Sequence, residues 1–388
     1  MSFRGWLLCL TAAVCPLSAS CSQELPIEDV SPIADVSRYS GMCDASAAVA
    51  LDAATLIAAD DEQNTLKVYR ADRPGPPVQS IPWDEPLGID PAQDKHPEVD
   101  IEGATVLGGR IYWISSHGRN KGGKWRANRH RLFAMTVTVR DGKVVAEPFG
   151  KASRTLIADL VRDDRMKGLG LAEALAIGKT EVGRLAPKKK GLNIEGLCAT
   201  PDGKSLLIGF RNPCGDGKAL LVPLHNPAAV LADGAAPRFG QPFLLNLQTR
   251  YEGESHALSV RSMEYSAGYG AYLIVAGRHD ERKVFALFRW SGGATDPPIL
   301  LRDGTASIQQ IPDFTPEALI VYPDRDEVQL LSDDGTLKVK VASAAECAEG
   351  EFDAGQCEAK YLRDETRKTF RSLWIKPDAL GSGAEQPR

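Results

Sequence analysis

The sequence lacks the short motifs that identify several common kinds of enzyme and binding protein. It has no GxSxG segment, which argues against a serine nucleophile, and neither a P-loop nor a GxGxxG turn, which argues against a nucleotide cofactor. No CxxC pair and no Cys/His set has the spacing of zinc ligands, so a structural zinc site is not expected. The formal net charge is −5, and without a basic excess nucleic acid is not an expected partner.

Long apolar runs are also scarce. Only Trp6–Leu17, preceded by Arg4, is mostly apolar, and it is too short for a comfortable transmembrane span. Its features are those of an export signal, so we predict a signal peptide over residues 1–20. The small residues before Cys21 resemble a bacterial lipoprotein signal, in which Cys21 would carry the lipid, although Leu17 lies one place further away than usual. Ordinary cleavage is the alternative. The predicted location is the bacterial cell envelope, periplasmic or as an outer-membrane lipoprotein attached only by that lipid, or alternatively secreted.

What the sequence does contain is a repeat. Five segments share one layout: an acidic residue, a short apolar run, a tight turn, a second apolar run and a polar cluster. In the third copy, Gly196–Thr200 and Ser205–Phe210 flank the turn-forming Pro201-Asp202-Gly203. An antiparallel hairpin returns the chain to the end where it began, so each acid and its polar cluster are expected at the same end of the fold. The opening acids are Asp44, Glu102, Glu195, Glu264 and Glu317.

A third strand-like run follows each hairpin, and three or four strands per unit describe a propeller blade. Self-similarity at roughly 50–60 residues is typical of such arrays. The predicted fold class is therefore all-β, a single β-propeller over residues 24–375 with five clear repeats and five to seven blades. The third runs begin at Leu66, Arg131, Ala219, Val284 and Leu337.

The interval between the second and third acids is the longest. It contains two runs of helical composition, 156–161 and 169–177, and the basic run Lys188-Lys189-Lys190. We predict a helical and basic insertion at about residues 150–190, although a degraded blade would also account for the extra length.

Export would permit disulfide bonds. Cys347 and Cys357 bracket a Glu/Gly-rich loop and are the predicted pair, whereas the pairing of the others stays open. The FRSLWIKP run after Arg363 is the expected last strand, and the tail 379–388 is expected to be disordered. The other cysteines beyond residue 21 are Cys43, Cys198 and Cys214.

A resemblance to a known family is carried by three runs: DIEGATVLGGRIYWISSHGRNKGGKWRANRHRLFA, NIEGLCATPDGKSLLIGFRNP and PEALIVYPDRDEVQLLSDDG. They resemble the bacterial family known as domain of unknown function 3616, over most of the chain from about Gly41 to Asp334. That resemblance implies a β-propeller but no catalytic role, because the family has no settled activity. More distantly, the EGL-type repeats are similar to esterase-like and phytase-like propeller proteins. This implies a calcium-dependent phosphoesterase, but no calcium-ligand set matches residue by residue.

The shared end of the hairpins collects an acidic sector, because the first and last repeats of a closed ring are neighbours. Oxygen ligands with few histidines suit Ca²⁺ or Mg²⁺ rather than zinc, so we predict a candidate Ca²⁺ site here. The predicted metal ligands are Asp44, Asp60, Asp61, Asp333 and Asp334.

The other repeats bring cationic and amide groups to the same end, where they suit phosphate or carboxylate. A metal beside such groups is the arrangement of metal-assisted phosphoester hydrolysis. The predicted catalytic residues are His117, Glu102 and Glu195, and the predicted anion-binding residues are Arg119, Asn120, Arg211, Asn212 and Arg278.

Each candidate also has a purely structural interpretation. A repeated acid can pair with an arginine of the next blade, His117 can be a hydrogen-bonded core histidine, and the basic run 119–131 can be solvated surface. Two functions from different classes follow. One is an exported, metal-dependent hydrolase of phosphoesters or other anionic esters. The other is a non-enzymatic envelope propeller that binds a small anionic ligand or an envelope protein through its rim.

Overall fold

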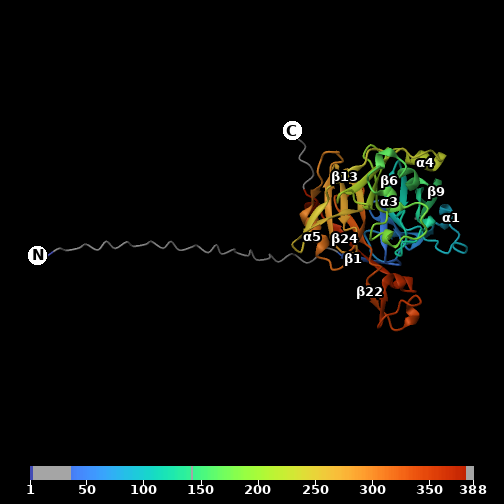
Figure 1. The fold of residues 1–388 in the computed structure, drawn as a ribbon. Helices are drawn as coiled ribbons and strands as arrows, with labels where there is room; N and C mark the ends of the chain where they lie inside the picture. The colour runs from blue at the N-terminus through green and yellow to red at the C-terminus, as the bar shows by residue number, and fades with distance from the viewer. Residues whose placement is uncertain (3–35, 141–142, 382–388) are drawn as a thin grey trace. The chain divides into compact units, whose positions relative to one another are not determined.

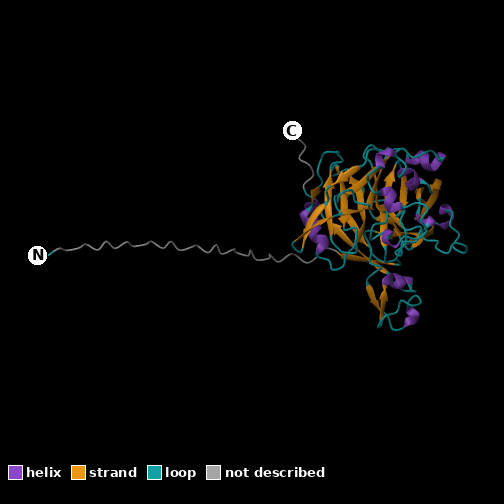
Figure 2. Ribbon diagram, in the orientation of Figure 1, coloured by secondary structure: helices purple, strands orange, loops and turns teal. Residues whose placement is uncertain are grey.

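The computed structural model describes residues 1–2, 36–140 and 143–381. These residues form five four-stranded antiparallel sheets arranged as the blades of a β-propeller (Figures 1 and 2). The predicted fold class is confirmed, with the lowest of the predicted blade numbers. Beyond residue 2 the predicted signal peptide, Cys21, and most of the predicted tail lie outside the described residues. Among the helices described, none has the length and apolar character needed to cross a membrane.

Four blades are each built from strands that follow one another along the chain, from the innermost strand outward. The first two consist of β2 (Ala45–Ala50), β3 (Thr55–Asp60), β4 (Gln63–Arg70) and β5 (Gln79–Pro82), then β6 (Ile101–Leu107), β7 (Arg110–Ser115), β8 (Leu132–Arg140) and β9 (Lys143–Ser153). The next two consist of β10 (Asn193–Ala199), β11 (Leu206–Asn212), β12 (Ala219–Leu224) and β13 (Phe243–Leu245), then β16 (Ser259–Ser266), β17 (Ala271–Gly277), β18 (Phe285–Trp290) and β19 (Ile299–Leu300).

The fifth blade joins the two ends of the described chain. It consists of β20 (Pro316–Val321), β21 (Val328–Ser332), β24 (Thr369–Ile375) and, at its outer edge, β1 (Val36–Ser40). The expected last strand is confirmed as β24. The innermost strands β2, β6, β10, β16 and β20 contact one another in a closed cycle, which completes the ring.

The run at Leu337 is not the third strand of the last blade, and that prediction is wrong. This segment forms β22 (Lys338–Lys340), which pairs with β23 (Gln356–Glu358) in a separate hairpin. The reason is composition: β22 presents two exposed lysines around one half-buried valine, whereas β24 is almost entirely buried. A position between two strands of a blade needs the apolar segment.

Each innermost strand carries a β-bulge near its start, where one extra residue is accommodated opposite the second strand. A small residue follows each bulge. In the third blade this is Gly196, where a Cβ would lie 2.6 Å from Val260 Cγ1 of the next innermost strand. The small side chain therefore lets adjacent blades approach closely. The bulged residues are Ser46, Glu102, Glu195, Arg261 and Glu317, and the small ones are Ala47, Gly103, Gly196, Ser262 and Ala318.

This register corrects the repeat predicted from the sequence. Glu102, Glu195 and Glu317 are equivalent, but Asp44 precedes the equivalent position and Glu264 follows it along the strand. The pattern of acids gave the wrong alignment of the fourth repeat, because that blade has a basic residue, Arg261, at the bulge.

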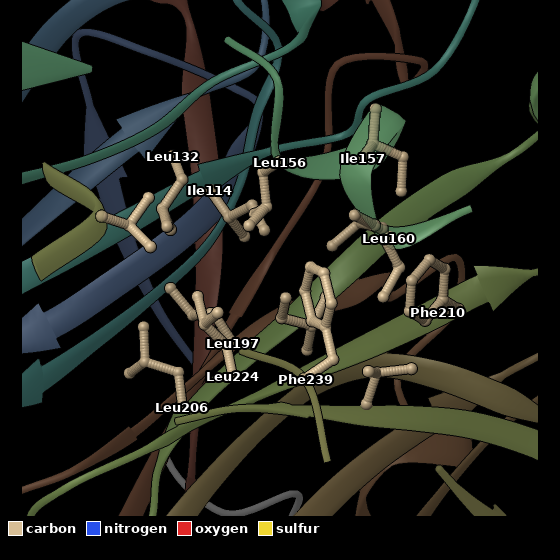
Figure 3. Close-up of a cluster of buried hydrophobic side chains, with 14 of the residues drawn as sticks. Ile114, Leu132, Leu156, Ile157, Leu160, Leu197, Leu206, Phe210, Leu224 and Phe239 are labelled. Atoms are coloured by element: carbon tan, nitrogen blue, oxygen red, sulfur yellow. The ribbon is translucent and has the colours of Figure 1, made fainter. Parts of the chain in front are cut away.

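The predicted insertion contains helices, as expected. A hydrophobic cluster fixes it to the second and third blades: Leu156, Ile157 and Leu160 point among Ile114, Leu132, Leu197, Phe210 and Leu224 (Figure 3). Helix also occurs outside the insertion. The α-helices are α1 (Asp84–Leu87), α2 (Leu156–Leu160), α3 (Leu171–Leu175), α4 (Pro227–Asp233) and α5 (Arg302–Gln309). The remaining elements are β14 (Gln248–Tyr251), β15 (Glu254–Ala257) and the 3₁₀ turns Ala127–Arg129, Asp164–Met166, Gly183–Leu185, Ala344–Glu346, Ala359–Tyr361, Glu365–Arg367 and Pro377–Leu380.

Candidate functional site

The bulges of the third, fourth and fifth blades form a buried charge network. Arg261 Nε lies 2.8 Å from Glu195 Oε2, and Arg261 Nη2 donates to Glu317 Oε1. Arg211 Nη1 donates to the other oxygen of Glu195 at 2.8 Å, which confirms the predicted proximity of this acid and arginine. These groups are buried together. Buried charges need a partner of opposite sign, and each glutamate here has an arginine that also fixes its position.

Arg261 is the residue of this network that the sequence interpretation missed. Burial lowers its pKa to about 10, and the neighbouring Arg211 contributes in the same direction, whereas Glu195 opposes the shift. Sequence offered one signal for it: Ser262 is the small residue that follows a bulge. Aligning the repeats on their small residues instead of their acids would have placed Arg261 at the site.

Beside this network lies a second cluster, called here the acidic end, with Asp44, Asp60, Asp61, Asp100, Glu102 and Asp333 as its members. Oxygen atoms of Asp44, Asp60 and Asp61 lie within 4.8 Å of one another, and so do those of Asp61, Asp100 and Glu102. Asp61, in the turn that follows β3, therefore belongs to both groups.

The first and last blades meet at the acidic end, as predicted. Asp44, which immediately precedes β2, forms a backbone bridge with Asp333, which follows β21. The next turn comes so close that a Cβ on Gly335 would lie 1.6 Å from Asp44 Oδ1. Glycine is therefore required there for Asp44 to keep its position.

Burial and mutual repulsion shift the pKa values of these carboxyl groups upward, except that of Asp333. Burial raises the pKa of Asp60 to about 7. Burial first, and then neighbouring carboxylates, hold the pKa values of Asp61 and Glu102 well above their usual range. Oδ1 of Asp61 is shielded from solvent and has no hydrogen-bond partner within the described structure. The cluster thus has an oxygen atom free to bind a cation.

Asp44 and Asp333 behave as a coupled pair. Burial, and then the charge of Asp333, raises the pKa of Asp44. Burial alone would also raise the pKa of Asp333, but the hydrogen bond from Asp44 holds it below its usual value. The pKa values of the two carboxyl groups are therefore shifted in opposite directions across the junction of the first and fifth blades.

Basic side chains surround the acidic end. Arg129 Nη1 lies 2.8 Å from Asp100 Oδ2, and Lys360 Nζ lies 2.9 Å from Glu62 Oε1. Lys188, from the basic run of the insertion, is exposed, yet partial burial and then the charges of Arg211 and Arg261 lower its pKa. The insertion therefore supplies an ammonium group close to the arginine network and Asp333, which the sequence interpretation noted only as a basic run.

A cavity of about 580 Å³ lies between the insertion and the third and fourth blades. Two of the predicted anion-binding residues, Asn212 and Arg278, line it. Arg278 also pairs with Asp280 at 2.6 Å, and Asn212 Nδ2 donates to the carbonyl of Pro187 at 2.7 Å. The insertion adds three further cationic residues to the lining, which makes the cavity suitable for an anion: Arg184, Lys189 and Lys190.

Three predicted site residues are used elsewhere. Asp334 Oδ1 lies 2.8 Å from Arg371 Nη2 and pairs with that arginine. Arg119 donates to the carbonyls of Gly123, Leu175, Ala176 and Lys179, so its guanidinium group ties the insertion to the second blade. Asn120 accepts N–H groups of its own loop. All three residues thus have structural partners, but Arg119 is buried, so the interpretation of this position as solvated surface is wrong.

His117 also has its contacts away from the acidic end. Its Nδ1 lies 2.9 Å from the carbonyl of Ser115, and its ring packs edge-on against His130, which in turn stacks on Trp125. Burial lowers the pKa of His117 to about 4, so the ring is neutral at pH 7. The catalytic role predicted for His117 gains no geometric support from these contacts.

The cysteines of the described chain are all free thiols. Cys347 and Cys357 are both buried in a small cluster with Val341 and Leu362 beside the β22–β23 hairpin. Their predicted disulfide therefore stays a prediction.

No protein-family model matches the chain, and no curated protein matches it in sequence. The resemblance to domain of unknown function 3616 thus stays a prediction. Solved structures similar to this chain include the glutaminyl cyclase of Myxococcus xanthus. The identity is 12% over 77% of this chain and 90% of the cyclase, with a TM-score of 0.38. Another is the PQQ-bound aldose sugar dehydrogenase of Streptomyces coelicolor, with 11% identity over 89% and 100% and a TM-score of 0.36. A GH43 protein of Bacillus licheniformis has 12% identity over 76% and 49% and a TM-score of 0.37.

Proposed function

We propose that this protein is a divalent-cation-dependent hydrolase of phosphoesters or other anionic esters, with Ca²⁺ as the cation. The observation that carries the proposal is the position of Asp61, which belongs to both groups of carboxylates. Its shielded Oδ1 has no hydrogen-bond partner within the described structure. Buried carboxylates repel one another and are costly to ionise without a counterion. A bound cation would offset that cost, and hard oxygen ligands favour Ca²⁺ or Mg²⁺.

The neighbouring groups have separate parts in the proposed reaction. The cation would be held by the acidic end, and it would polarise an ester oxygen and stabilise the charge that develops there. Lys188 and the cationic cavity lined by Arg278 and Lys189 would hold the anionic substrate. Glu102 would accept a proton from the water whose oxygen attacks the phosphorus or carbonyl carbon, while the bond to the leaving oxygen breaks. Glu195, fixed by two arginines, is a positioning residue.

The test is a Ca²⁺ titration of the full chain by calorimetry, together with a screen of chromogenic phosphate and carboxylate esters with and without chelator. We expect Ca²⁺ binding, Ca²⁺-dependent hydrolysis, and loss of both in Asp61→Asn. The exposed Asp353→Asn is the matched control and should behave as wild type. Hydrolysis that survives both chelator and Asp61→Asn, or a complete absence of binding to Ca²⁺ and Mg²⁺, would overturn the proposal.

A second function, a non-enzymatic propeller that binds an anionic ligand or an envelope protein, is favoured by one observation. Glu195 is paired with Arg211 and Arg261, and Glu317 is paired with Arg261, as fasteners between blades would be. Binding of Ca²⁺ and inorganic phosphate without turnover of any ester would favour this function.

Location in the cell envelope is also a proposal, and it is supported by the sequence of residues 1–21. Cell fractionation tests it. If Cys21 carries lipid, Cys21→Ser should move the protein from the membrane fraction into the soluble one. A wild-type protein that is already soluble would leave simple export as the proposal.

A further inference from the structure

The opposite end of the innermost strands contains a separate cavity of about 830 Å³. It is lined by the C-terminal ends of β2, β6, β16 and β20 and by the turns that follow β16 and β20. The acidic end lies at the other ends of these strands, so the two sites share no residue. The volume falls within the range of small-molecule sites, roughly 300–1,000 Å³.

The carboxyl group of Glu264 lines this cavity beside mostly apolar walls, and Asp324 and Asp326 line it as well. Val106 is 46% exposed there, a large fraction for a valine on an innermost strand. Leu319, Ile320 and Val321 form another wall. The cavity therefore combines an apolar surface with a few carboxyl groups, an arrangement that fixes the orientation of a ligand.

Glu264 is held in place by neutral groups. The Thr105 hydroxyl donates to both of its oxygens, at 3.2 and 3.0 Å, and the backbone N–H of Tyr265 donates to Oε1 at 3.0 Å. The Cys198 thiol donates to Oε1 at 3.6 Å. Within the described part of the chain, no basic side chain forms an ion pair with Glu264, so its charge has no counterion.

The charged rim of the cavity does not supply that counterion. Asp324 and Asp326 are acidic, and Arg325, between them, also lines the cavity, so acidic residues outnumber the basic one. The Arg325 guanidinium lies over the rings of Tyr322 and Trp374, 5.5 and 5.1 Å from their centroids, and 3.8 Å from Glu327. The electrostatic balance of the cavity is therefore negative.

We propose that this cavity binds a small organic cation, an alkylammonium or a similar amine, whose positive group pairs with Glu264 and whose apolar part lies against Val106. Among the described residues, Glu264, Asp324 and Asp326 do not form a close group of carboxyl oxygens, so the cavity is a poor site for Ca²⁺ or Mg²⁺, which take six or more oxygen ligands. An ammonium group on an apolar body matches both the acid and the walls. Burial raises the pKa of Glu264 to about 7. Burial also holds the pKa values of the neighbouring Cys198 thiol and Tyr272 hydroxyl above their usual range.

The experiment is an NMR titration of the full chain at pH 8 with n-butylammonium chloride and, separately, with butan-1-ol, which has the same chain length without the charge. We expect butylammonium to bind at least tenfold more tightly than butanol, because only the amine can form a charge-assisted hydrogen bond with Glu264. Glu264→Gln, which keeps the shape of the side chain and its bond to Thr105, should remove that advantage and leave butanol binding unchanged. Asp61→Asn, at the acidic end, should leave both affinities unchanged.

Equal binding of amine and alcohol, or undiminished amine binding by Glu264→Gln, would overturn the proposal. If Glu264→Gln does not fold, Val106→Trp provides a second test, because an indole at this exposed position would take up the space beside residue 106 in which the apolar part of the amine is proposed to lie. Loss of butylammonium binding in Val106→Trp would support the site, and wild-type affinity would contradict it. Neither result depends on hydrolysis at the acidic end.

Discussion

The two ends of the innermost strands carry different chemistry although the same strands build both. At the start of each strand a bulge turns one side chain out of the ladder, and these positions hold three glutamates and an arginine in four of the five blades. At the other end the pairing is regular, and the residues are mainly small or apolar, with Glu264 as the exception. The blade geometry thus fixes where charge can be concentrated.

The two ends also treat a buried carboxyl group differently. At the acidic end carboxylates lie next to one another, and Asp100 also pairs with Arg129, so each one depends on its charged neighbours. At the other end, where the second cavity lies, the carboxyl group of Glu264 is held by hydrogen bonds from a hydroxyl, a thiol and a backbone N–H. Removing a charged partner at the acidic end leaves an uncompensated charge. Replacing Glu264 at the other end alters only the binding of one proton.

The largest expected effect comes from Arg261→Ala. It would leave Glu195 without one of its arginines and Glu317 without its ion pair, so we expect a loss of about 3–5 kcal/mol in the free energy of unfolding. Urea denaturation at pH 7 measures it. Arg282→Ala, which removes an exposed arginine, is the control and should cost less than about 0.5 kcal/mol. A loss below about 1 kcal/mol in Arg261→Ala would show that the network does not fasten the blades.

Glu264→Gln should change how stability depends on pH. In the unfolded chain this acid loses its proton near pH 4.3, but in the folded protein it keeps the proton up to about pH 7. Between these values the folded state binds more protons, so its contribution to stability falls as the pH rises. Because the side chain is partly exposed, we expect the variant to gain on the order of 2 kcal/mol relative to wild type from pH 4.5 to 8. Identical pH profiles of unfolding would contradict this.

Asp61→Asn should have a smaller effect and the opposite sign to Arg261→Ala. Without Ca²⁺, replacing a carboxyl group surrounded by other carboxylates should raise the free energy of unfolding by about 1 kcal/mol. The variant should also lose the rise in melting temperature that Ca²⁺ produces in wild type. Asp334→Asn serves for comparison and should be destabilising, because Asp334 pairs with Arg371. If both variants lose stability equally, Asp61 has a partner in solution that offsets its charge.

The smallest expected effect on stability is that of Lys188→Met, within about 0.5 kcal/mol of wild type, because the side chain is exposed. We expect roughly tenfold weaker binding of inorganic phosphate in calorimetry, the scale of one charge-assisted contact. Lys204→Met, in an exposed turn of the third blade, supplies the control. Equal phosphate binding by both variants would remove Lys188 from the proposed anion site.

Sequence patterns predicted the propeller because a hairpin is a local structure: Pro201-Asp202-Gly203 and the flanking apolar runs determine it within one segment. The junction of Asp44 with Asp333 followed from ring closure alone. What could not be predicted is the choice of partner for a long side chain. Nothing in the sequence near Arg119 shows that it bonds to carbonyls more than fifty residues away, or that Lys188 lies near Arg211. Arg261 was hidden because the acids, rather than the small residues after the bulges, defined the repeat.

The closure of the ring by β1 has a mechanical consequence. Val36 at the start of β1 lies opposite Leu373 near the end of β24, so the two ends of the fold leave from the same place on neighbouring strands. A force applied to both ends would separate this pair one hydrogen bond at a time, as a zipper opens, instead of shearing all of its bonds together. The β1–β24 pair should therefore separate at a low stretching force, even under conditions in which heat or urea does not unfold the propeller.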